Sequence, residues 1–128
     1  MRTDEPRAVH LKDYHTPDFH VSKIDLDFVL EPDAARVAAK MQVKRTGSKS
    51  APLVLNGEQL KLLGLRIDNQ ELSGAHFRID DETLTIEIVP DEFTLDVFTE
   101  IAPASNTSLE GLYLSKGIFC TQCEPEGF

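Results

Sequence analysis

Apolar and polar residues alternate along most of this chain with a period of two. The clearest run spans 24–30, where Ile24, Leu26 and Phe28 are separated by aspartates. After a short turn signal, residues 35–44 repeat the pattern. Successive side chains of a strand point to opposite faces, so the two runs predict a long antiparallel hairpin with one face buried and one wet.

Shorter strands are predicted over the rest of the chain. In 83–89 we expect Leu84, Ile86 and Ile88 to share one face, and residues 57–60 are compatible with one helical turn. No stretch of ten residues keeps a 3.6-residue apolar period, so helix should be nearly absent. The pattern predicts an all-β fold, either an antiparallel β-sandwich or a saddle-like curved sheet. The further strands are expected at 53–55, 62–67, 77–79, 83–89 and 93–101.

The 128 residues are expected to form one domain, 1–128, with three parts. Residues 1–19 read as an extended arm, 20–103 carry the strands, and 104–128 form a tail. We expect Leu11, Tyr14 and Phe19 to hold the arm across the domain, with a free arm as the alternative.

Charge excludes some functions. The net charge is −9, and residues 68–100 contain ten acidic residues against one basic residue, Arg78. Such a surface argues against nucleic acid, because phosphate binding needs clustered Lys and Arg. The stretch is interpreted as a solvated sheet face, with an acidic rim that attracts cationic peptides as the alternative. No apolar run of about 18 residues and no signal peptide are present, so we expect no membrane contact and a cytoplasmic location.

Cys120 and Cys123 form the only C-x-x-C pair. A structural zinc site needs four ligands, and a redox C-x-x-C normally opens a helix, so we expect two small buried side chains instead. The sequence H-E-x-x-H does not occur, so no metal ligand and no catalytic residue is assigned to this chain.

Gln122 and Glu124 are the candidate binding residues. Two positions apart on an extended chain, they project to the same face. The carboxylate supplies charge and the amide carbonyl a neutral acceptor, which together suit an ammonium ion. A peptide α-amino group has a pKa near ~8 and is mostly protonated at neutral pH. Without further context, the same residues also fit an ordinary polar strand end.

The tail resembles a known family. Residues 106–113 (Asn-Thr-Ser-Leu-Glu-Gly-Leu-Tyr) and 120–128 (Cys-Thr-Gln-Cys-Glu-Pro-Glu-Gly-Phe), with the opening Leu11-Lys12-Asp13-Tyr14, are similar to the N-terminal domain of bacterial aminopeptidase N. These are zinc-dependent alanyl aminopeptidases of the gluzincin class. The resemblance implies that Gln122 and Glu124 help to hold the amino group of a peptide substrate. It also implies a catalytic domain on the same polypeptide, where a zinc-bound water attacks the scissile carbonyl.

The chain departs from that family by lacking the zinc-binding and exopeptidase motifs. The family also continues beyond the equivalent of Phe128 with more strands. We therefore expect a domain cut short at its C-terminal end, which binds no zinc itself and is inactive alone. Its partners would be peptide substrates and the catalytic domain. A sheet edge left open would favour self-association between chains.

Two other function classes fit the strand pattern. One is a non-catalytic β-sandwich module for binding or interaction, although a sugar platform usually needs stacking rings and this chain has no Trp and two Tyr. The other is a regulatory fragment that docks on a catalytic subunit.

Overall fold

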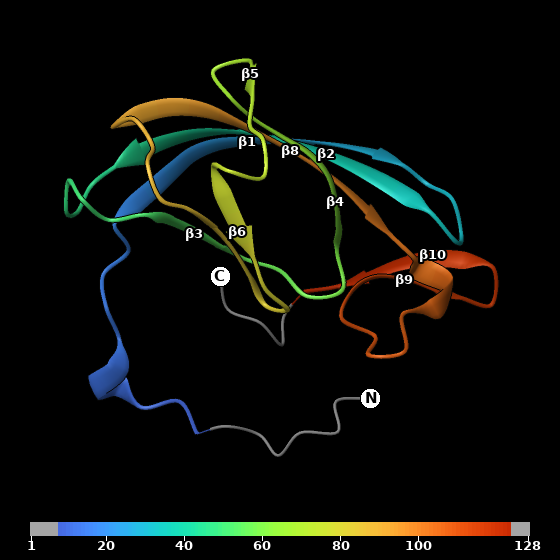
Figure 1. Cartoon of the computed structure of the whole chain (residues 1–128). Coiled ribbons are helices and arrows are strands. Elements are labelled where there is room, and N and C mark those ends of the chain that lie inside the picture. Colours follow the sequence, from blue (N-terminus) through green and yellow to red (C-terminus); the bar gives the residue numbers. More distant parts are fainter. Residues whose placement is uncertain (1–7, 124–128) are drawn as a thin grey trace.

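The computed structural model describes residues 8–123 and confirms an all-β fold. One antiparallel sheet has the strand order β1-β2-β8-β4-β5, a second has the order β3-β7-β6, and β9 pairs with β10 as a hairpin. The large sheet arches over the small one, and the hairpin lies at the end of β8 (Figure 1). The strands are β1 (Phe19–Val29), β2 (Ala35–Arg45), β3 (Leu53–Asn56), β4 (Lys61–Ile67), β5 (Gln70–Glu71), β6 (Phe77–Ile79), β7 (Thr83–Ile86), β8 (Glu92–Ile101), β9 (Gly111–Ser115) and β10 (Ile118–Gln122).

The core lies between the inner face of the large sheet and the small sheet. Cross-strand register sets Ile24 of β1 beside Met41 of β2, and Met41 beside Leu95 of β8, so one apolar face continues across three strands. The small sheet covers only part of this face. The buried apolar cluster therefore draws on β2, β3, β4, β7, β8 and the turn before β8: Val43, Leu53, Leu65, Ile86, Val89, Phe93 and Leu95.

β1 has no buried residue, although its alternation predicted one buried face. Its inner residues Ile24 and Leu26 are each 52% exposed, because β1 is the outermost strand and the small sheet does not reach it. The prediction of a half-buried hairpin is therefore correct for β2 and wrong for β1.

Two local predictions are also wrong. β7 ends at Ile86, and the chain then leaves the ladder, so Ile88 is 90% exposed and Val89 turns into the core instead. Residues 57–60 form no helical turn; Gln59 has a φ of 55°, outside the right-handed helical region.

The part of the arm that the structure describes does not pack across the domain. Leu11 lies in a short 3₁₀ turn (Leu11–Asp13) and is 90% exposed, and Tyr14 is 68% exposed. Only Phe19, the first residue of β1, meets the core, where its ring lies edge-on to Phe93 with centroids 6.4 Å apart.

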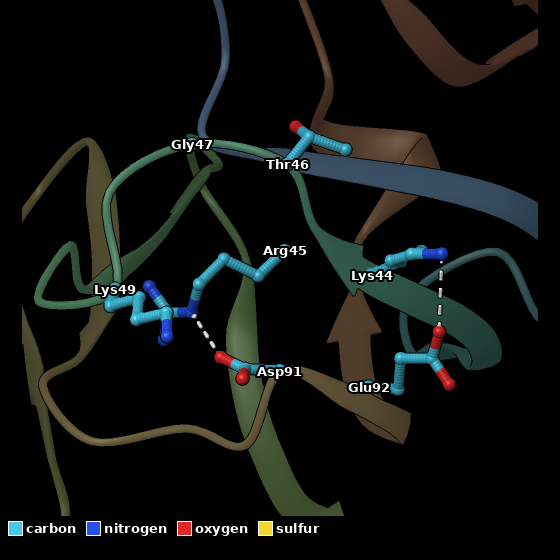
Figure 2. Close-up of a pocket in the computed structure, with 7 residues that line it drawn as sticks. All are labelled: Lys44, Arg45, Thr46, Gly47, Lys49, Asp91 and Glu92. Atoms are coloured by element: carbon cyan, nitrogen blue, oxygen red, sulfur yellow. Dashed lines mark hydrogen bonds and ion pairs between the residues drawn. The ribbon is translucent and has the colours of Figure 1, made fainter.

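Arg45, the last residue of β2, joins the two sheets at one corner. Its guanidinium donates to the carbonyl oxygens of Ser48 and Ala51 at 2.7 Å each, and to that of Val89 at 3.1 Å. It also donates from Nε to Asp91 Oδ1 at 3.0 Å (Figure 2) and lies over the Phe19 ring at 4.7 Å. Because its side chain is only 5% exposed, these bonds act away from water, where unmade ones are costly.

Replacing Arg45 by Lys is expected to lower the free energy of unfolding by about 2–4 kcal/mol, because an ammonium cannot reach all four acceptors and leaves carbonyl groups without a donor. Urea denaturation followed by circular dichroism measures the change. The matched control is Lys44→Met, which removes the adjacent exposed ion pair to Glu92 and should change stability by less than about 0.5 kcal/mol. Equal effects of the two substitutions would contradict this role for Arg45.

Asp80 closes the β6–β7 turn. Its Oδ1 accepts the backbone N–H groups of Glu82 and Thr83 at 2.9 and 2.7 Å, and its Oδ2 accepts the Thr83 hydroxyl at 2.8 Å. These bonds, the Glu82 N–H first, favour the carboxylate and lower the pKa of Asp80 below its ordinary 3.8.

A lowered pKa stabilises the fold above the ordinary value of 3.8, and the contribution is lost as the pH falls through the lowered pKa. The stability difference between the parent chain and Asp80→Asn should therefore be largest above pH 3.8 and shrink on further acidification. Denaturation curves recorded from neutral to strongly acidic pH test this. The control is Asp81→Asn, which removes the neighbouring carboxylate without touching the three bonds and should lower stability at neutral pH less than Asp80→Asn does.

Candidate functional site

The tail residues 111–122 form a tight hairpin that the sequence analysis did not predict. Lys116 and Gly117 make the turn with φ values of 50° and 80°, the signs that a type I′ turn requires. A Lys-Gly pair between two apolar runs was the available signal. Register pairs Gln122 at the end of β10 with Gly111 at the start of β9.

Asn106 fixes the start of this hairpin. Its side-chain amide donates to the carbonyl oxygens of Glu110 at 2.8 Å and Leu112 at 2.9 Å, the two residues that flank Gly111. Ser108 donates its hydroxyl to Asn106 Oδ1 at 2.8 Å, which orients the amide. Gly111 has a φ of 70°, in the left-handed region that glycine adopts most readily. Asn106 therefore sets the backbone opposite Gln122.

Gln122 lies at the open end of the hairpin and is exposed. The structure thus brings one of the two predicted amine-binding residues to an accessible, backbone-paired position. Glu124, the other predicted residue, lies outside the described residues. Asn106 escaped the sequence reasoning because its bonds go to backbone carbonyl groups that only the folded turn brings within its reach.

The two cysteines differ from the expectation that both are buried. Cys120 is partly buried in β10, whereas Cys123 is exposed, and both are free thiols. β10 keeps the chain extended from Cys120 to Gln122. Because a strand rises about 3.3 Å per residue, the Cα atoms of Cys120 and Cys123 lie about 10 Å apart. A disulfide needs Cα atoms within about 7 Å, so these thiols cannot pair within the chain.

Two shallow hollows lie on the large sheet, away from the hairpin. The first, about 410 Å³, surrounds the Arg45 corner, where Arg45 pairs with Asp91 and Lys44 with Glu92 (Figure 2). The second, about 370 Å³, lies on the outer face, where Asp25, Lys40, Asp96 and Arg66 follow one another across four strands. Alternating charges of this kind stabilise a sheet face and offer no preference for a cation or an anion.

The acidic stretch 68–100 is largely used within the fold. Five of its carboxylates form ion pairs with basic residues, and Asp68 accepts the backbone N–H of Thr94 at 2.9 Å. These partners favour the interpretation as a solvated sheet face over an acidic rim. The ion pairs are Arg78–Glu87, Arg45–Asp91, Lys44–Glu92, Lys40–Asp96 and Lys61–Glu100.

Within residues 8–123, no group of three or more His, Cys, Asp and Glu side chains is placed to hold a metal ion. In the same range, no helix has the length and apolar character needed to cross a membrane.

Known proteins with similar sequences are aminopeptidases. No protein-family model matches the chain. It is 51% identical over 128 residues to aminopeptidase N of Caulobacter vibrioides and 43% identical over 126 residues to aminopeptidase N of Escherichia coli. The matches cover 100% and 98% of this chain but 15% and 14% of those proteins.

Solved structures with a similar fold point to related proteins. Legionella pneumophila aminopeptidase A, crystallised with aspartic acid, matches 91% of this chain and 14% of its own with a TM-score of 0.80 and 28% identity. Yeast leukotriene A4 hydrolase, 23% identical with a TM-score of 0.59 over 74% of this chain and 16% of its own, shares the fold. The chain is therefore a homologue of the N-terminal part of aminopeptidase N.

Proposed function

We propose that this chain is the part of a zinc-dependent alanyl aminopeptidase that helps to hold the free amino group of a peptide, and that it hydrolyses nothing alone. The observation that carries the proposal is the 51% identity to aminopeptidase N over the whole chain. The accessible position of Gln122, fixed through Gly111 and Asn106, supports it.

The proposed chemistry is recognition of an ammonium ion. The Gln122 carbonyl and the Glu124 carboxylate both accept hydrogen bonds, and the protonated α-amino group of a peptide offers three donors. An internal peptide bond carries no such cation, so a site of this kind selects chain ends. A charge-assisted bond to the carboxylate would supply most of the attraction.

Zinc belongs to the proposed whole enzyme. Residues 8–123 offer no ligand cluster that fits the ion, so no step through zinc is assigned to them. The catalytic domain of the same polypeptide would supply the metal and the general base. A cytoplasmic location completes the proposal and is favoured by the sparse use of cysteine, with two in 128 residues.

The proposal predicts amine binding without turnover. Titration with alaninamide should shift the backbone amide NMR signals of Thr121 and of Gly111, the partner of Gln122, with weak affinity because the site is incomplete. N-acetyl-alaninamide, which has no ammonium, should not shift them. Gln122→Ala and Glu124→Gln should each reduce the shift at a given concentration. Zinc-supplemented chain should release no chromophore from alanine p-nitroanilide. Equal binding of the acetylated ligand, or turnover that copurifies with the folded chain, contradicts the proposal.

Asn106→Asp should loosen the hairpin end that carries Gln122. A carboxylate of the same size cannot donate and would face the carbonyl oxygens of Glu110 and Leu112, at a cost of about 2–4 kcal/mol. Amide hydrogen exchange should accelerate at the β9–β10 pairs and stay unchanged at the β2–β8 pairs. Ser108→Ala, which removes one exposed bond to the same side chain, should cost less, about 1 kcal/mol. Unchanged exchange at Gln122 contradicts this role for Asn106.

A further inference from the structure

β1 is the long open edge of the large sheet. It spans 11 residues and lies first in the strand order, and no strand among residues 8–123 pairs with its other side. The other strands that end a sheet have at most 5 residues: β5 has 2, β3 has 4, β6 has 3, and β9 and β10 have 5 each. Unpaired backbone groups over such a length form a template for another strand.

The inner face of β1 is apolar and uncovered. Ile24 and Leu26 are each 52% exposed and Phe28 is 45% exposed, in a row that continues the core face of the neighbouring β2. The outer face of the same strand carries Lys23 and the aspartates 25 and 27. An incoming strand therefore gains most if it places apolar residues on the inner face and both charge signs on the outer one.

β1 itself meets these requirements. We propose that two copies of this chain associate through antiparallel pairing of their β1 strands, about a two-fold axis that lies between their two Asp25 residues, normal to the sheet. Such an axis keeps inner face beside inner face and uses the same patch twice. Ile24 then lies opposite the second copy's Leu26, and Lys23 opposite the second copy's Asp27, each twice. The five-stranded sheets join into one continuous sheet.

The register follows from the charges and the bulge. A shift of the axis to Leu26 would set Asp25 opposite Asp27 twice, and like charges directly opposite destabilise a pair. A shift to Ile24 would place Leu26 opposite Ser22, in the β-bulge between Val21 and Lys23, and would limit the regular ladder to residues 23–25. With the axis at Asp25 the regular ladder runs over residues 23–27 before Phe28 meets Ser22. With the axis at Asp25, one like-charge pair remains. It is offset because Lys23 Nζ lies 3.2 Å from Asp25 in the same chain, and Lys40 lies beside it on β2.

Light scattering on the complete chain tests the association. We expect a mass that rises with concentration from 14.3 kDa towards twice that value and stops there. Leu26→Lys should keep the mass at that of one chain, because it places two cations in the apolar row. Because Leu26 is half exposed in the single chain, the circular dichroism spectrum of the Leu26→Lys variant should stay that of the parent chain. Ile88→Lys, at an exposed apolar residue outside β1, is the matched control and should associate like the parent.

Charge swaps test the register. Lys23→Asp and Asp27→Lys should each raise the dimer dissociation constant by about fivefold or more, because each creates two like-charge pairs. The double variant has the net charge of the parent and should return to within about twofold of it. Asp27→Lys best separates the proposed register from a general charge effect, because it makes the net charge of each chain less negative by two. Net repulsion alone would therefore tighten its association, whereas the proposed register weakens it.

Four results would overturn the proposal: a parent chain that stays monomeric at its highest soluble concentration, growth beyond two chains, Leu26→Lys associating like the parent, or Asp27→Lys associating more tightly.

Discussion

Arg45 ties together the two chain segments that pass between the sheets at one corner of the fold. Residues 46–52 lead from β2 to β3, and residues 87–91 lead from β7 to β8. The guanidinium binds backbone carbonyls of both, at Ser48 and Ala51 on one side and Val89 on the other. A planar group with five donors can do this, whereas an apolar residue would leave carbonyl groups of two connections unsatisfied. The small sheet is held over β2 and β8 on this side, which determines where the core lies.

That placement leaves the opposite side of the large sheet uncovered. The buried cluster includes Val43 of β2 and Leu95 of β8 but no residue of β1. The inner-face side chains of β1, such as Ile24 and Leu26, are about half exposed. Within the described residues, Phe19 anchors the start of β1 on Phe93, and the rest of the strand depends on its backbone pairing to β2. A strand with an apolar face, an open edge and both charge signs is suited to meet a strand of the same kind.

The period-two pattern predicted the strands well where pairing is long. In β2 and β8 one face packs on the core, so apolar residues occur at about every second position. The pattern failed where tertiary coverage decides exposure. Ile24 and Val43 look equivalent in the sequence, yet only Val43 lies beneath the small sheet. Ile88 and Val89 exchanged roles because the strand ends at Ile86, and a strand end has no periodic signal. The candidate site was found through its charged and amide residues, whereas Asn106 was missed, since its bonds to backbone carbonyls depend on a turn that only the fold defines.

The position of Gln122 depends on a chain of local bonds that reaches back to the large sheet. Gln122 pairs with Gly111, and Asn106 binds the carbonyl groups on both sides of Gly111. Asn106 follows the 3₁₀ turn Pro103–Ser105, in which the Ala104 N–H donates to the Pro32 carbonyl oxygen at 2.8 Å. Pro32 lies in the connection between β1 and β2. The proposed amine-binding residue is therefore fixed relative to the β1–β2 connection rather than to the Arg45 corner, so loss of Arg45 should disturb the sheet packing before it disturbs the hairpin.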